Sequence, residues 1–230
     1  MIEPWIPLTK LRNYHSHFHV YSAFFFAKAS SNIEQEYGSA NVVPFDRIAE
    51  HRANVTGAVF AATAFLEATI NELFADAADE HPNNIWQLGF EVLTRLASLW
   101  EVEYFERYAR LMEKFQTALK MAGKEQFNTG ERHYQDVKLV IELRNTLTHY
   151  KPETTFSNSM DTNKLEKSLR GKFPINPLVP NEVPFFPDKC LGYGCAKWAC
   201  ESSLAFADEF FSRMGLTPVY TSVRSQLTTK

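Results

Sequence analysis

The sequence has no excess of charge of one sign, few cysteines and no long hydrophobic run. Its 24 basic and 27 acidic residues give a net charge of −3, too near neutral for a protein that coats nucleic acid or an anionic membrane by charge alone. Three cysteines in 230 residues do not form the dense disulfide framework of a small secreted domain. The start, MIEPWIPLTK, lacks a signal-peptide pattern, and the apolar stretches fall short of the roughly 20 residues of a membrane span. We therefore expect a cytoplasmic protein that does not enter a membrane.

Common catalytic motifs are also missing. The chain has no GxxxxGK[ST] phosphate loop, no GxSxG nucleophile elbow and no HExxH metal motif, and its LGYG stretch lacks the third glycine of a dinucleotide fingerprint. Cys190, Cys195 and Cys200 have a spacing that fits neither a zinc pair nor a redox CxxC, so we expect ordinary packed or surface thiols. The sequence therefore predicts no cofactor.

A histidine run near the start leaves one metal site to consider. His15 and His19 stand one turn apart on a helix, with His17 between them, and imidazole nitrogen is a good zinc ligand. No carboxylate or cysteine within a turn completes a ligand set. We expect partly exposed histidines and no bound metal, with metal binding by this run as the alternative.

Hydrophobic spacing predicts helices along most of the chain. Apolar residues recur in steps of three and four, and no stretch shows the two-residue alternation of a half-buried strand. Pro44 suits the first turn of one helix, whereas Gly123 and Pro152 end two others. The sequence therefore predicts one all-α domain, a bundle of about five main helices with its core in residues 45–150 and 190–214. The five expected helices span residues 14–37, 45–78, 90–122, 131–149 and 190–214.

Residues 151–189 differ from the rest in composition. The stretch 152–187 holds six of the eleven prolines, so we expect an irregular excursion with one short helix near 162–170. Its phenylalanines and aliphatic residues indicate that it packs on the bundle. The tail after Gly215 is expected to be frayed.

The end of the fourth expected helix, IELRNTLTHY, combines two side chains that suit phosphodiester chemistry. Arg144 offers a permanent fork of donors for phosphate oxygens, and a histidine such as His149 exchanges a proton near pH 7. Asn145 lies four residues before His149, where its amide is expected to orient the imidazole. Leu143 and Leu147 are expected to anchor the helix in the core. The alternative is an ordinary helix C-terminus decorated with cations.

Two polar residues interrupt an apolar stripe on the helix over residues 45–78. Glu67 and Asn71 follow Phe60 and Ala64 along one face and precede Phe74. Because buried polar groups need partners, we expect Glu67 to neutralise Arg144 or to share a hydrogen bond with His149. The alternative is that both polar side chains face solvent.

Taken together, RNTLTHY at the end of a core helix, FLEATINELF on a long preceding helix and a final amphipathic helix resemble a HEPN-domain protein. That family is an all-α bundle whose ribonucleases carry an arginine, a polar residue directly after it and, four to six residues on, a histidine. Arg144, Asn145 and His149 match this pattern. The resemblance spans about 45–150 and 190–214, and accounts for neither the first 44 residues nor the proline-rich excursion.

The resemblance implies a metal-independent endoribonuclease, often a toxin or defence effector with an antitoxin partner. His149 would act as general acid or base for attack of the 2′-hydroxyl on the phosphate, Arg144 would stabilise the phosphate, and DNA would not be cleaved. Because one histidine does not serve as both base and acid in one step, we expect a homodimer with a composite site. Tyr150 and Lys151 are candidates for holding RNA, as are the basic residues Arg132 and Lys138.

The competing hypothesis is a non-catalytic helical module. It would dimerise and bind a nucleotide or a protein such as a nucleotidyltransferase, with Arg144 and His149 in a structural ion-pair network. The near-neutral net charge favours it, because ribonucleases that act on long RNA display more positive surface.

Overall fold

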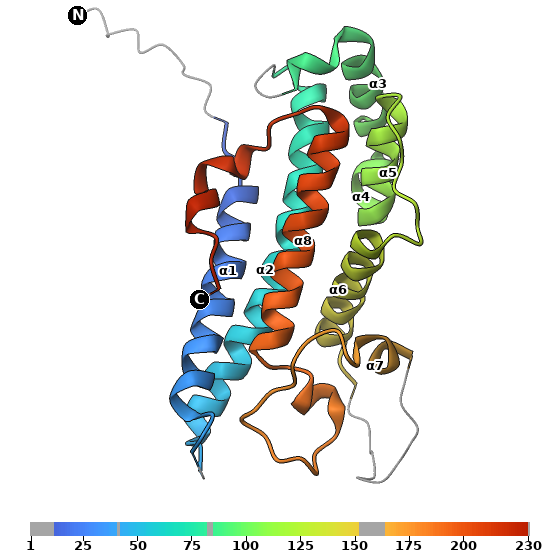
Figure 1. Ribbon diagram of the computed structural model, residues 1–230. Coiled ribbons are helices and arrows are strands. Elements are labelled where there is room, and N and C mark those ends of the chain that lie inside the picture. The colour runs from blue at the N-terminus through green and yellow to red at the C-terminus, as the bar shows by residue number, and fades with distance from the viewer. Residues whose placement is uncertain (1–11, 41, 82–84, 152–163, 230) are drawn as a thin grey trace, which may run out of the picture.

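The computed structural model describes residues 12–40, 42–81, 85–151 and 164–229. Over these residues the chain forms helices and turns and no strand, which confirms the predicted all-α bundle. Three long helices lie side by side (Figure 1), namely α1 (Ser16–Tyr37), α2 (Phe45–Ala78) and α8 (Tyr193–Met214). Their ends fall within three residues of the predicted ones, because the apolar spacing is regular to the last turn.

The predicted helix over residues 90–122 is wrong, since the chain forms three shorter helices there. These are α3 (Phe90–Trp100), α4 (Glu103–Tyr108) and α5 (Leu111–Met121). The backbone is extended at Val102 and again at Arg110. The first break lets Trp100 stack on Phe74 of α2 at 5.6 Å while Phe105 meets the same ring edge-on at 5.0 Å. Aromatic packing on α2 therefore outweighs the helical continuity that the spacing predicted.

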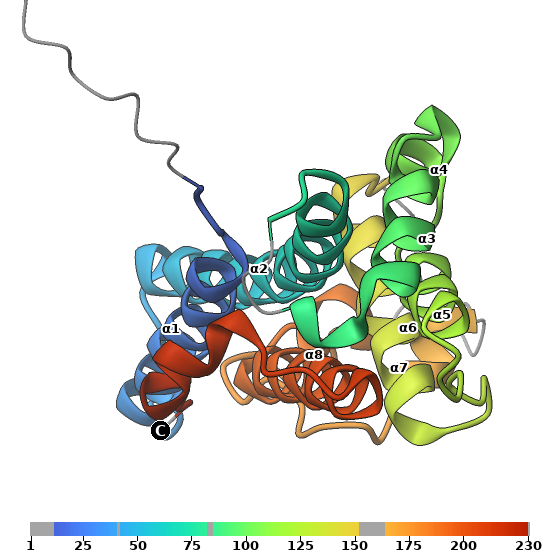
Figure 2. The ribbon, with the colours of Figure 1, turned by 90° about the horizontal axis from the view of Figure 1, so that it is seen from above.

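Helix α2 is the central element of the bundle. Viewed from above (Figure 2), it lies between α1 and α8 on one side and the group of α3, α4 and α5 on the other. Its fully buried side chains occur every three or four residues, in keeping with a helix that has neighbours around most of its circumference. They include Val55, Val59, Phe65, Leu66, Ile70 and Phe74.

Among the described residues, α2 alone is long and apolar enough to cross a membrane. Half of its most apolar stretch is buried within the bundle. The core helix of a soluble protein has the same length and composition, and the packing of α2 against α1 and α8 is that of a core helix.

Glutamates from neighbouring helices cap the N-termini of α1 and α8. Glu72 on α2 accepts a hydrogen bond from the backbone N–H of His15 at 2.6 Å, and Glu34 on α1 accepts one from the backbone N–H of Tyr193 at 2.6 Å. A carboxylate satisfies the free N–H groups of a first helical turn and also complements the helix dipole. These contacts fix the lengthwise positions of the three long helices relative to one another.

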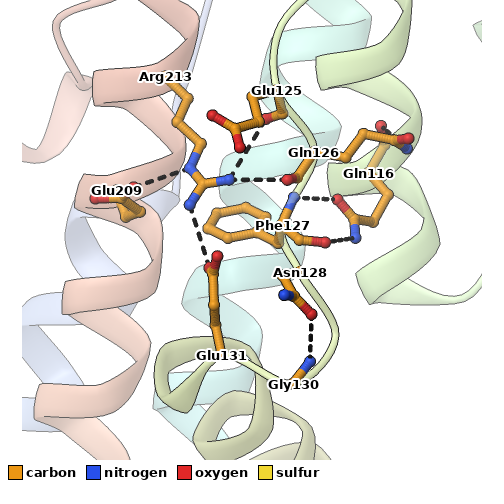
Figure 3. A network of polar contacts seen from close by, with 9 residues as sticks. All are labelled: Gln116, Glu125, Gln126, Phe127, Asn128, Gly130, Glu131, Glu209 and Arg213. Atoms are coloured by element: carbon orange, nitrogen blue, oxygen red, sulfur yellow. Dashed lines mark hydrogen bonds and ion pairs between the residues drawn. The ribbon is translucent and has the colours of Figure 1, made fainter.

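Helix α6 (Arg132–Thr148) carries the candidate motif and ends one residue before the predicted end. The loop before it is tied to α8 through Arg213 (Figure 3). That guanidinium donates to the carbonyl of Gln126 at 2.9 Å, pairs with Glu131 at 3.2 Å and lies 4.4 Å from the centre of the Phe127 ring. The start of α6 is therefore anchored to the bundle.

The described part of the proline-rich excursion packs on the bundle, as the sequence predicts. Helix α7 (Lys164–Leu169) buries Leu165 and Leu169, and a short turn, η2 (Phe185–Lys189), buries Phe185. The expected start of the short helix, at residue 162, lies outside the described residues. Lys172 pairs with Asp136 of α6 at 2.6 Å, which joins the excursion to the motif helix.

The chain after Gly215 is not frayed, contrary to expectation. It forms a short 3-10 helix, η3 (Val219–Gln226), which packs on α1. Tyr220 is fully buried there, and its hydroxyl donates to Asp208 of α8 at 3.0 Å. The buried ring of Tyr220 and its hydroxyl hydrogen bond thus hold η3, a segment with few apolar residues, against the bundle.

Candidate functional site

Helices α2 and α6 bring Glu67 and Arg144 together. Arg144 Nη2 donates to Glu67 Oε1 at 2.7 Å, across 77 residues of sequence. This is one of the two contacts expected for Glu67. The side chains of Arg144 and Glu67 are 27% and 48% exposed, so the pair lies at the edge of the helix interface. Leu143 is fully buried and Leu147 is half-buried against the core, which holds α6 in place.

Most N–H groups of Arg144 have no hydrogen-bond partner within the described residues. A guanidinium has five N–H groups, and Glu67 accepts a hydrogen bond from Nη2. The Nε atom is buried and has no partner within the described part of the chain. An arginine that is held by one carboxylate and keeps several free donors is well suited to bind a phosphate.

His149 lies just beyond the last residue of α6 and is exposed. Its backbone N–H donates to the carbonyl of Asn145 at 2.9 Å. Over the described ranges, the expected hydrogen bond from the Asn145 amide to the imidazole is not formed, and Asn145 is itself exposed. The backbone leaves the helix at His149, which has φ −109° and ψ 33°.

Arg144 and His149 do not share a face of the helix. Five residues at 3.6 per turn place position 149 about 140° around the axis and about 7.5 Å along it. In the described residues no contact joins the two side chains. Within the described part of one chain, the phosphate-binding group and the proton-transfer group are therefore not in contact.

Asn71, one turn after Glu67 on α2, contacts a residue that the sequence analysis missed. Lys114 of α5 is only 7% exposed, and its Nζ donates to Asn71 Oδ1 at 3.0 Å and to the carbonyl of Glu106 at 2.7 Å. Burial lowers the pKa of Lys114, while the charges of Glu67 and Glu106 partly oppose that shift. The one sequence signal for the burial of Lys114 is its position on the apolar face of a helix, because residues 111, 115, 118 and 119 around it are apolar at helical spacing.

A polar pocket of about 220 Å³ opens beside the Glu67–Arg144 pair. Its walls come from α2, from α4 and its connection to α5, and from α5 itself. The lining residues are Glu67, Asn71, Glu106, Arg107, Ala109, Leu111 and Lys114. Glu67 thus belongs to both the pocket and the pair with Arg144.

The other residues proposed to hold RNA lie at separate places. Tyr150 is half exposed, with its ring centre 6.5 Å from that of Phe186, and Lys151 is exposed. Arg132 lies at the opposite end of α6, in a wider cleft of about 540 Å³ whose lining also includes Lys172 and Lys197. These three cations each have a carboxylate partner. The structure therefore brings neither Tyr150 nor Arg132 into contact with Arg144.

The histidine run does not form a metal site in the described chain. The rings of His15 and His19 are 6.1 Å apart, and no group of three His, Cys, Asp or Glu side chains gathers there to hold an ion. Burial lowers the pKa of His19, and the nearby His15 lowers it further. The three cysteines are buried free thiols, and burial raises the pKa of Cys200.

Comparisons with protein-family models, with curated proteins and with solved structures find no match to this chain. The functional interpretation therefore depends on its own residues.

Proposed function

We propose that the protein is a metal-independent endoribonuclease of the HEPN type. The observation that carries the proposal is the position of Arg144, which Glu67 holds at the edge of the bundle with most of its donors free, beside a polar pocket. The exposed His149 at the end of the same helix supplies a group for proton transfer.

In the proposed reaction, the ribose 2′-hydroxyl attacks the adjacent phosphorus and the 5′-oxygen leaves. One histidine removes the proton from the attacking hydroxyl, and a second donates a proton to the leaving oxygen. Arg144 stabilises the charge that develops on the phosphate oxygens. Because only RNA has the 2′-hydroxyl, DNA is not a substrate.

The active form in this proposal is a homodimer. A two-fold axis near the end of α6 would bring Arg144 and His149 of both chains to one groove. The lack of a contact between these two side chains in the described part of one chain supports this arrangement. Tyr150 and Lys151 would hold flanking RNA. Cytoplasmic location and a role as a toxin or defence effector, controlled by an antitoxin, belong to the same proposal.

The test is cleavage of total cellular RNA and of tRNA in excess EDTA. His149→Ala is expected to lower cleavage by on the order of 10²-fold or more, the usual contribution of a positioned proton-transfer group. His133→Ala is the matched control, since His133 is another exposed histidine on α6, and it should retain activity. Equal activity in His149→Ala would refute the assignment and indicate a contaminating nuclease.

The second candidate is a non-catalytic dimeric module that binds a nucleotide or a partner protein. The observation that favours it is the pairing of cations in the wider cleft, where Arg132, Lys172 and Lys197 each face a carboxylate and so offer less positive charge to a polyanion. Absence of RNA cleavage by the wild-type protein, with an intact dimer, would favour this function.

A further inference from the structure

The polar pocket beside Arg144 has the size and chemistry of a base-binding subsite. Its volume of about 220 Å³ is below the roughly 300–1,000 Å³ of pockets that enclose drug-sized ligands, so it suits a fragment such as one nucleobase. Charged and amide side chains dominate its lining, which disfavours an apolar ligand. Glu67 connects it directly to the proposed phosphate-binding arginine.

The pocket is lined by both cations and carboxylates. Lys114 is held by its two hydrogen bonds, and Arg107 of α4, which pairs with Glu103 at 3.3 Å, adds a second cation. The carboxylate of Glu106 has no hydrogen bond or ion pair within the described residues. It lies near enough to Lys114 to favour the charged amine. Glu106 and Lys114 therefore offer a ligand a hydrogen-bond acceptor next to a hydrogen-bond donor.

We infer that this pocket binds a guanine base of the RNA, next to the phosphate that Arg144 holds. The inference rests on the proposed ribonuclease function and names its base preference. Guanine is the base whose one edge carries two adjacent donors, N1–H and the 2-amino group, beside an acceptor, O6. Glu106 accepts from the two donors in a bidentate pair, and Lys114 or Arg107 donates to O6.

The other bases fit this set less well. Adenine and cytosine each offer a single exocyclic amino group on that edge, next to a ring acceptor that a carboxylate repels. Uracil offers one N–H between two acceptors. Each of these bases gives Glu106, which is exposed, at most one hydrogen bond, so it lacks the second charge-assisted bond that guanine makes.

Binding of mononucleotides tests the pocket without any need for catalysis. Titration calorimetry with guanosine and adenosine 5′-monophosphates should show at least about tenfold tighter binding of the guanine nucleotide. Glu106→Gln should remove most of that ratio, because an amide no longer accepts two hydrogen bonds. Glu113→Gln removes the same charge from an exposed site on α5 that does not line the pocket, and it should keep the ratio.

Cleavage of four short single-stranded RNAs that differ at one base then links the pocket to the reaction. The wild type should cleave the guanine-containing RNA at least about tenfold faster, and Glu106→Gln should lose this preference. Equal binding of the two nucleotides, or a preference kept in Glu106→Gln, overturns the guanine pocket whether or not RNA is cleaved. Guanine-selective binding without cleavage of any RNA keeps the pocket and rejects the ribonuclease.

Discussion

The Glu67–Arg144 pair yields a quantitative prediction, because both side chains are partly exposed and joined by a short hydrogen bond. Exposed ion pairs contribute about 0.2–1 kcal/mol, and hydrogen bonds to charged groups contribute about 1.5–3 kcal/mol when well shielded. With Arg144 27% and Glu67 48% exposed, the pair belongs near the top of the first range. We expect a coupling free energy of about 1 kcal/mol.

A double-mutant cycle measures this coupling directly. Glu67→Gln removes the charge and keeps the side-chain length, and Arg144→Met removes the guanidinium and keeps an unbranched stem. Urea unfolding of the four proteins at the same protein concentration gives the free energies. Glu91 and Arg95 on α3 form a more exposed pair, with side chains 81% and 50% exposed, and serve as the control cycle. That pair should couple by about 0.3–0.5 kcal/mol.

The ionic-strength dependence adds a second check on the same pair. Raising the salt concentration to about 1 M shortens the screening length to about 3 Å and should reduce the coupling. Additivity of Glu67→Gln and Arg144→Met within about 0.3 kcal/mol would refute the reasoning, because it would mean that the two side chains do not interact in solution.

Three further changes test other parts of the structure. Gly194→Ala places a Cβ 2.4 Å from the carbonyl oxygen of Pro174, so we expect a loss of about 1–3 kcal/mol in urea unfolding, whereas Gly130→Ala, with 3.4 Å to its nearest neighbour, should be near neutral. Burial lowers the pKa of Lys114 below 10.5 in the folded state, so the unfolded chain binds more protons and wild-type stability should rise as the pH increases through the folded-state pKa toward 10.5; Lys114→Met should lose that rise. Wild type and His149→Ala should be mixed at constant total protein and left until their subunits have exchanged. If one groove uses both histidines, the cleavage rate should then be proportional to the square of the wild-type fraction, whereas direct proportionality would contradict the composite site.

The sequence predicts the long helices well because each has a regular apolar face and a clear end. Pro44 starts α2, Pro152 follows α6 and Gly215 ends α8 in a left-handed conformation. The breaks at Val102 and Arg110 have no such mark, since neither glycine nor proline is near them. The break at Val102 goes with contacts of Trp100 and Phe105 to Phe74, which is far away in sequence.

In the candidate site too, features that depend on local sequence were predicted better than contacts between residues far apart in sequence. A polar interruption of an apolar face predicts that Glu67 has a partner, and the partner is Arg144. The contact between Lys114 and Asn71 could not be predicted, because the two residues are 43 apart in sequence and no local pattern near either one indicates the other. The predicted side-chain contact between Asn145 and His149 is not formed in the described chain, although the backbone N–H of His149 still donates to the Asn145 carbonyl.

The near-neutral charge of the chain restricts how it would hold RNA in the proposed function. With a net charge of −3 and three paired cations in its wider cleft, the protein attracts a long polyanion weakly at distance. Affinity would then come from a few short-range contacts, which the proposal assigns to the Glu67–Arg144 edge and its polar pocket. Recognition of one base and its phosphate releases few counterions, so binding should depend only shallowly on salt. The charge balance that argues against a general RNA-binding surface is therefore consistent with a nuclease that selects a short, specific site.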